Sequence, residues 1–171
     1  MERTIRTAVP ADLDGLATVE ETCFPPEKAA SRETLQRRLE RYSGHFLLLL
    51  EEERLIGFIN GFVTDSPDLT DDMYTHAELH NENGAWQMIF GLNTLPEYRR
   101  QGCAAQLLRR MIEDAAAQGR EGLVLTCRDE LIHYYAKFGF MNEGVTAKST
   151  HGGVRWNQMR LRFGDILHQE R

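Results

Sequence analysis

The chain of 171 residues is 42% hydrophobic and 27% charged, close to the average for soluble globular domains, so we expect one domain spanning residues 1–171. A net charge of −6 provides no basic field for nucleic acid, and no apolar run approaches the roughly 18 residues that cross a membrane. The charged start, MERTIRTAVP, precedes no apolar signal core, which predicts a cytoplasmic protein. Three cysteines without CxxC spacing argue against a disulfide framework and a zinc site: Cys23, Cys103 and Cys127.

Hydrophobic periodicity predicts alternating strands and helices along the whole chain. The expected elements are a strand at 3–9, a helix from Pro10–Asp12 to Cys23, a helix capped by Ser31 and reaching about Tyr42, a hairpin at 45–64, a strand at 86–95, a helix ending before Gly119, a strand at 122–127, a helix at 129–138 that begins at a capping Asp, and closing strands at 140–148 and 154–163. Early strands are joined by hairpins and later ones by helices. The order therefore predicts an α/β domain with a mixed sheet.

A long polar connection, residues 65–85, separates the hairpin from the next strand. No Lys or Arg occurs between Asp65 and Tyr98, whereas seven carboxylates do: Asp65, Asp68, Asp71, Asp72, Glu78, Glu82 and Glu97. This acidic stretch either steers a cationic partner toward the protein or is a loop kept solvated by its charge. The pattern leaves both interpretations open.

The stretch YRRQGCAAQLLRRM, residues 98–111, places two arginines and a glycine directly before a helix. Unpaired N–H groups at a helix N-terminus bind anions, and a glycine allows close approach of a phosphate to the backbone. Arg99 and Arg100 add positive charge at the same place. Neither GxGxxG after the first strand nor GxxxxGK[ST] is present, so the phosphate ligand is not identified by those motifs. Taken alone, Gly102 could simply fit a tight turn.

This stretch resembles the acetyl-CoA motif of the GNAT family of N-acetyltransferases, Q/R-x-x-G-x-G/A, which is matched by residues 99–104, RRQGCA. A second family feature, an aromatic-rich helix ending Y-x-x-x-G-F, is matched by residues 135–140, YAKFGF. With the order of elements, the resemblance covers nearly the whole chain. It implies a single-domain fold with a mixed, mostly antiparallel sheet of six to seven strands, about four helices, and two strands that splay apart at the acetyl-CoA site.

The resemblance also implies roles for individual residues. The backbone of the strand before the motif pairs with the pantetheine arm, the motif amides hold the pyrophosphate, and Tyr135 protonates the departing thiolate. Tyr135 could instead be a core tyrosine packing under the sheet. The implied acetyl-CoA-binding residues are Leu92, Asn93, Thr94, Arg99, Arg100, Gln101, Gly102, Cys103, Ala104, Ala105 and Tyr135. No metal or second cofactor is implied.

Residues 20–39 and 125–140 resemble more closely the serotonin N-acetyltransferase-like, or arylalkylamine, branch of the family. The paired histidines of that branch fall on Met88 and Phe90 here, so its proton relay is missing and serotonin itself is not the expected acceptor. Replacement bases lie in the connection before that strand, and a histidine pKa near neutrality suits proton removal: His76, Glu78 and His80. Each of them alone is more often a surface residue.

The resemblance predicts an acetyl-CoA-dependent N-acetyltransferase that acts on a primary amine by direct attack in a ternary complex. We expect a small cationic or arylalkylamine-like acceptor bound by Phe24, Phe90, His151 and Trp156. A protein or peptide amine, or a non-catalytic acyl-CoA-binding regulatory module, remain alternatives. A homodimer is expected by resemblance only, and nucleic acid and membrane are not expected partners.

Overall fold

The structure, a computed structural model, describes residues 2–148 and 155–164. It packs as two compact units, each built from two separate stretches of chain: residues 1–61 with 91–111, and residues 62–90 with 112–171. In the described ranges, four α-helices and nine strands in two sheets form a mixed α/β structure, which confirms the predicted class. The single domain predicted for residues 1–171 stays a prediction.

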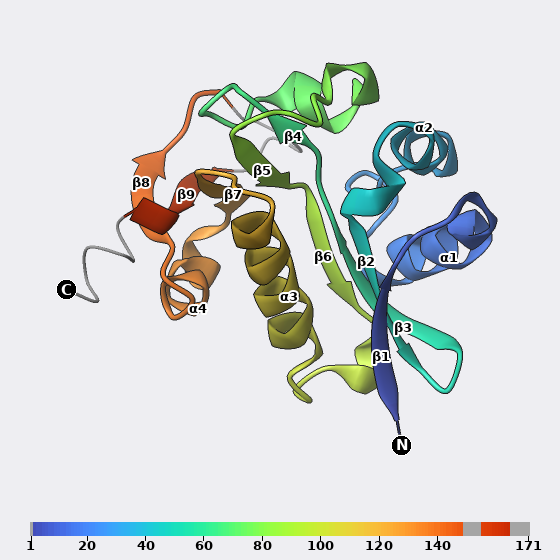
Figure 1. Cartoon of the computed structure of the whole chain (residues 1–171). Coiled ribbons are helices and arrows are strands. Elements are labelled where there is room, and N and C mark those ends of the chain that lie inside the picture. The colour runs from blue at the N-terminus through green and yellow to red at the C-terminus, as the bar shows by residue number, and fades with distance from the viewer. Residues whose placement is uncertain (1, 149–154, 165–171) are drawn as a thin grey trace. The chain divides into compact units, whose positions relative to one another are not determined.

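The first unit is an antiparallel four-stranded sheet in the order β1-β2-β3-β6. In Figure 1, α1 and α2 lie together on one side of this sheet. Its core is made of apolar side chains from the central strands and the inner faces of the helices, including Leu16, Leu35, Phe46, Leu48 and Phe58. Its elements are β1 (Arg3–Thr7), α1 (Leu13–Cys23), α2 (Arg32–Tyr42), β2 (Phe46–Glu51), β3 (Arg54–Asn60), β6 (Gly91–Thr94) and the first turns of α3 (Cys103–Ala117).

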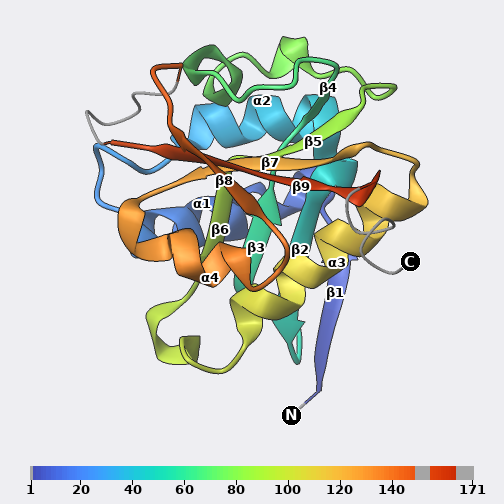
Figure 2. The ribbon, with the colours of Figure 1, turned by 90° about the vertical axis from the view of Figure 1, so that its left-hand side faces the viewer.

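The second unit is a five-stranded sheet in the order β4-β5-β7-β9-β8, in which only the β5–β7 pair is parallel. Figure 2 shows β7 and β9 side by side, and α4 packs against β8 and β9. Its elements are β4 (Val63–Thr64), β5 (Trp86–Ile89), the last turns of α3, β7 (Gly122–Cys127), α4 (Ile132–Ala136), β8 (Met141–Val145) and β9 (Asn157–Arg162).

Two predicted strands are each divided in the structure. The strand expected at 86–95 becomes β5, which pairs with β7, and β6, which pairs with β3, with Phe90 outside both ladders. The second strand of the hairpin likewise becomes β3 and β4, with residues 61–62 between them. At each break the chain stops pairing with strands of one sheet and begins to pair with strands of the other. The described residues therefore contain more strands than the six to seven predicted.

Local signals placed most helix ends correctly. Ser31 Oγ accepts a hydrogen bond from Thr34 N at 3.1 Å, as the predicted cap of α2 requires. Gly119, just past α3, has a φ of 80°, and its N–H donates to Ala116 O at 3.1 Å. The helix expected at 129–138 is shorter, because residues 129–131 form a 3-10 turn before α4 and the Asp129 carboxylate accepts from an asparagine of β9 instead of capping. No helix in the described ranges is long and apolar enough to span a bilayer.

Candidate active site

The turn between β6 and α3 has the backbone of an anion-binding site. Arg100 and Gly102 adopt left-handed conformations, with φ of 63° and 78°, and turns of this kind direct successive N–H groups toward one point. The first helical hydrogen bond at this end of α3 runs from Gln106 N to Gly102 O at 3.0 Å, so the amides of residues 103–105 have no intrahelical acceptor. The Arg100 guanidinium is exposed, without a partner in the described part of the chain. Geometry and charge therefore both suit a phosphate.

Arg3, which belongs to no recognisable motif, supports this turn from β1. Its Nη2 donates to Gln101 Oε1 at 2.5 Å and its Nη1 to Cys103 Sγ at 3.3 Å. The Arg3 Nε in turn donates to Glu51 Oε2 at 2.8 Å, which orients the guanidinium. The sequence places Arg3 in an alternating strand but does not predict its contacts, because its partners lie about 50 and 100 residues away along the chain.

β6 forms an edge of its four-stranded sheet. Its register with β3 places Thr94 opposite Gly57 and Gly91 opposite Asn60. Among the described residues no strand of that sheet pairs with the other edge of β6, so this edge is open to an extended ligand except at Thr94 O, which accepts from Cys23 Sγ and Arg99 Nε. This arrangement suits the pantetheine arm expected along Leu92 to Thr94, an expectation that stays a prediction.

The side chain of Asn93 belongs to a buried hydrogen-bond pair that sequence reasoning missed. Asn93 is 2% exposed, and its Nδ2 donates to Glu20 Oε1 at 2.7 Å. Glu20, on α1, is 6% exposed, and its Oε2 accepts from Ala30 N at 2.8 Å. A signal existed, since Glu20 lies four residues after Leu16 and three before Cys23 on the face predicted to be apolar.

Tyr135 is half-buried on α4 and packs against two aromatic rings. Its ring centroid lies 5.2 Å from that of Tyr134 and 6.1 Å from that of Phe140. Burial, with smaller effects of Cys127 and Tyr134, raises the pKa of Tyr135 above its ordinary value. The hydroxyl has no hydrogen-bond partner among the described residues. The phenol therefore keeps its proton at neutral pH and has it free to donate.

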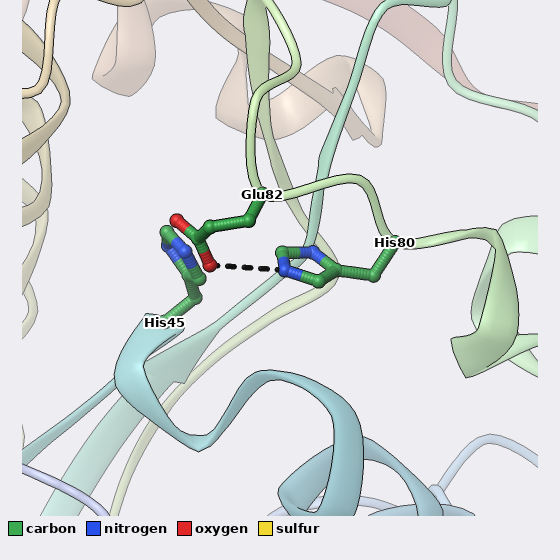
Figure 3. A group of neighbouring side chains, drawn as sticks. All are labelled: His45, His80 and Glu82. Carbon is green, nitrogen blue, oxygen red and sulfur yellow. Dashed lines mark hydrogen bonds and ion pairs between the residues drawn. The ribbon is translucent and has the colours of Figure 1, made fainter.

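The three proposed bases lie in two separate pairs. The His76 Nδ1 is 3.0 Å from Glu78 Oε1, and both side chains are more than half exposed. His80 is held more tightly: its Nδ1 accepts from Val63 N at 3.1 Å, and its Nε2 lies 3.1 Å from Glu82 Oε1 (Figure 3). Because both ring nitrogens of His80 are engaged, it can accept a proton only if one of these bonds opens.

The residues proposed for the acceptor site belong to different elements of the chain. Phe24 is the half-buried residue that ends α1, and Trp156 is the half-buried residue before β9. Phe90 lies in an aromatic cluster, its ring centroid 4.9 Å from Phe62 and 5.1 Å from Tyr74. His151 falls outside the described residues. The structure thus supplies a candidate aryl-binding surface at Phe90 and Tyr74, which are half-buried, whereas Phe62 is fully buried beneath them.

Several carboxylates of the acidic connection are already paired. Asp68 accepts from Lys148 Nζ and Arg160 Nη2 at 2.5 and 3.1 Å, and these cations keep its pKa low. Glu82 Oε2 lies 2.9 Å from Arg120 Nη2. Local ion pairing therefore weakens the interpretation of this stretch as a field that steers a cationic partner.

Comparisons with known proteins agree with this arrangement. The model of the Acetyltransferase (GNAT) family matches residues 13–140, which include both motifs and the turn before α3. This chain belongs to the acetyltransferase (GNAT) family. Serotonin N-acetyltransferase of Mesocricetus auratus is 34% identical over 112 residues, 60% of this chain and 53% of that protein. YkwB, an uncharacterised N-acetyltransferase of Bacillus subtilis (strain 168), is 26% identical over 78% of this chain and 64% of its own length.

The match therefore spans between half and two thirds of the length of these GNAT relatives. Among solved structures, the loading GNATL domain of CurA from Lyngbya majuscula superposes with a TM-score of 0.81 and 21% identity, covering 96% of this chain and 100% of that domain. This likeness confirms the predicted GNAT fold class.

Proposed function

We propose that the protein transfers the acetyl group of acetyl-CoA to a primary amine, by direct attack in a ternary complex. The observation that carries the proposal is the turn before α3, where left-handed Arg100 and Gly102 and the unpaired amides of residues 103–105 combine in a GNAT family chain. Such a turn matches the pyrophosphate of coenzyme A in charge and in hydrogen-bonding capacity.

The chain's own residues would then divide the binding of acetyl-CoA between the loop and the strand. The amides from Arg100 to Ala105 hold the pyrophosphate, and the Arg100 side chain adds a charge-assisted contact. The free edge of β6, from Leu92 to Thr94, pairs with the amides of the pantetheine arm. The Arg99 side chain contacts β6, since its Nε donates to Thr94 O at 3.3 Å.

Proton transfer accompanies the attack. A protonated amine has no free lone pair, so a base has to remove one proton before the nitrogen attacks the thioester carbon. The departing thiolate is protonated by the Tyr135 hydroxyl, whose raised pKa keeps it in the acid form. The exposed His76–Glu78 pair is a candidate base in which the carboxylate orients the imidazole.

For the acceptor we propose a small cationic or arylalkylamine-like amine. The matching relative is named serotonin N-acetyltransferase, and the half-buried rings of Tyr74 and Phe90 offer a surface to an aryl group, supported from beneath by the fully buried Phe62. Met88 and Phe90 occupy the positions of that branch's histidines, which argues against serotonin itself. Two alternatives differ from this proposal in what they bind: a peptide amine would make no use of an aryl-binding surface, and a regulatory acyl-CoA-binding module would bind no acceptor.

Free-thiol release from acetyl-CoA, measured with arylalkylamines, polyamines, amino acids and short peptides, tests the proposal. Calorimetry measures acetyl-CoA binding on the same preparation. We expect binding together with turnover of at least one amine class, and the class that responds separates small amines from peptides. Binding without turnover of any amine would favour the regulatory module, and absence of binding would overturn the proposed function.

A further inference from the structure

A row of polar side chains crosses the face of the four-stranded sheet that α1 and α2 cover. Asn60 and Asn93 lie on this face together with Gly91, because Gly91 pairs with Asn60 and Asn93 follows two residues later. The helices supply one partner to each asparagine: Arg38 Nη1 donates to Asn60 Oδ1 at 2.9 Å, and Glu20 accepts from Asn93. Both asparagines are at least 98% buried, and apart from this row with Glu20 and Arg38 the layer consists mainly of apolar side chains. Buried polar groups in such a layer require an explanation.

The charge of Glu20 is not neutralised in this row. Its two oxygens accept from Asn93 Nδ2 and Ala30 N, and no Lys or Arg side chain forms an ion pair with it among the described residues. A carboxylate can accept about four hydrogen bonds, so about two acceptor positions remain. Burying a carboxylate without a cation is unfavourable, which makes this a place where a positively charged donor would be stabilised.

The neighbouring amide oxygen points to the same donor. Asn93 Oδ1 is buried and has no hydrogen-bond partner. Gly91 lies beside this oxygen, and a Cβ there would be 3.6 Å from Asn93 Oδ1 and 3.3 Å from Asn60 Nδ2, so any larger residue would crowd the row. An oxygen acceptor without a donor, beside a carboxylate that has no cationic partner, matches an ammonium group, which carries three donors and a positive charge.

We propose that the Glu20 carboxylate and Asn93 Oδ1 bind the ammonium group of the acceptor, and that Glu20, in place of the exposed His76–Glu78 pair, is the base that deprotonates it; this rests on the proposed N-acetyltransferase function. The Glu20 carboxylate takes one proton from R–NH3⁺, and the nitrogen lone pair then forms the bond to the thioester carbon. The C–S bond breaks, a second proton leaves the nitrogen, and the thiolate gains one through the Tyr135 hydroxyl. The net reaction is R–NH3⁺ plus acetyl-CoA giving the acetamide, coenzyme A and one proton, which Glu20 returns to solvent.

Other charged and titratable groups near Glu20 are already committed. Cys23, one turn later on α1, donates to Thr94 O at 3.3 Å, and burial raises the pKa of its thiol. Arg99 lies beyond Cys23 and donates to the same carbonyl, and Arg38 on α2 donates to Asn60. Ala30 belongs to the connection between α1 and α2, so this connection covers one of the two carboxylate oxygens of Glu20.

The test compares the variant Glu20→Gln with the wild type on two amines of nearly the same shape. Phenethylamine is protonated at the assay pH and needs a base, whereas β,β-difluorophenethylamine is largely unprotonated in mildly alkaline buffer and needs none. We expect Glu20→Gln to lower kcat/KM for phenethylamine by about 100-fold or more and to affect the difluoro compound much less. Glu21→Gln, which removes the same charge from an exposed position of α1, is the matched control.

The acetyl-CoA affinity and the midpoint of thermal unfolding are measured for each variant together with its kinetics, so that a loss of cofactor binding or of the fold is not mistaken for a loss of the base. An equal loss on both amines would show that Glu20 only supports the fold, and an unchanged variant would remove it from the reaction; either outcome overturns the inference and leaves the proposed function standing. A wild-type protein that turns over no amine of the panel would overturn the proposed function itself. If Glu20→Gln does not fold, Asn93→Leu, a substitution of similar volume, is tested in its place. This variant loses one hydrogen bond to a charged group, so we expect the KM for phenethylamine to rise about tenfold. An unchanged KM would overturn the inference.

Discussion

Arg100 and Gly102, separated by a single residue, both hold left-handed backbone conformations immediately before α3. Arg100 does so without the freedom of glycine, at a cost of about 1–2 kcal/mol. The strain has a physical purpose if the amides of this turn bind pyrophosphate. Residues 99–104 are thus the part of the site in which motif, backbone geometry and charge agree.

Replacement of Gly102 with Val should weaken acetyl-CoA binding by at least tenfold, because a β-branched residue disfavours a φ of 78° and obstructs approach to the backbone. No atom would lie within 4 Å of the new Cβ, so the loss would not come from a clash within the protein. Calorimetric titration measures the Kd. Gly119→Val is the matched control, because Gly119 has a similar φ of 80° and an equally open surrounding at the other end of α3. Equal affinities in the two variants would mean that the phosphate binds elsewhere.

Replacement of Arg3 with Ala should raise the Kd for acetyl-CoA by less than about tenfold and leave kcat nearly unchanged. Arg3 acts through Gln101 and Cys103, and each lost hydrogen bond contributes about 0.5–1.5 kcal/mol. Arg6→Ala on the same strand, which removes an exposed pair with Asp12, serves as the control. A fall in kcat with unchanged Kd would contradict the supporting role.

The sequence predicted the helix ends and the turn before α3, since these depend on short-range signals such as the Ser31 cap. It did not reveal the break at Phe90, because a continuous apolar run carries no mark of the point where a strand changes partner. Nor did it identify Glu20 and Arg3. Their roles depend on contacts with Asn93 and Gln101, 73 and 98 residues away along the chain.

Replacement of Tyr135 with Phe should preserve acetyl-CoA affinity and lower kcat by about 100-fold, because the thiolate then departs without its proton donor. Steady-state thiol release together with calorimetry separates the two effects. Tyr134→Phe on the same helix is the control, as its ring packs against Tyr135 and Phe138. Unchanged turnover in Tyr135→Phe would assign Tyr135 to packing.

Alkaline pH should destabilise the fold through the buried Tyr42 and the half-buried Tyr135. Burial raises the pKa of both Tyr42 and Tyr135 in the folded state. Above about pH 10 the unfolded chain releases these protons while the folded chain keeps them, so the unfolding free energy falls by up to about 1.4 kcal/mol per pH unit for each group. Urea unfolding at several alkaline pH values measures the slope. Tyr42→Phe should reduce it, and an identical slope would contradict the assignment.

Replacement of Gly91 with Ala should raise the KM for the amine acceptor several-fold while leaving the Kd for acetyl-CoA close to that of the wild type. The added methyl would fill the space beside Asn93 Oδ1, at 3.6 Å, and press on Asn60 Nδ2, at 3.3 Å. Gly44→Ala adds the same atom at a position with no neighbour within 4 Å and controls for the substitution. Equal KM values in the two variants would count against an ammonium site at this place.

The central claim, acetyl transfer to an amine, is tested most directly by following the acetyl carbon itself. Wild-type protein is incubated with acetyl-CoA labelled with ¹³C at the acetyl carbonyl and with phenethylamine or the best amine of the panel, and ¹³C NMR is recorded over time. We expect an acetamide resonance to replace the thioester resonance in step with thiol release. Label that remains in the thioester, or that appears only as free acetate, would contradict it.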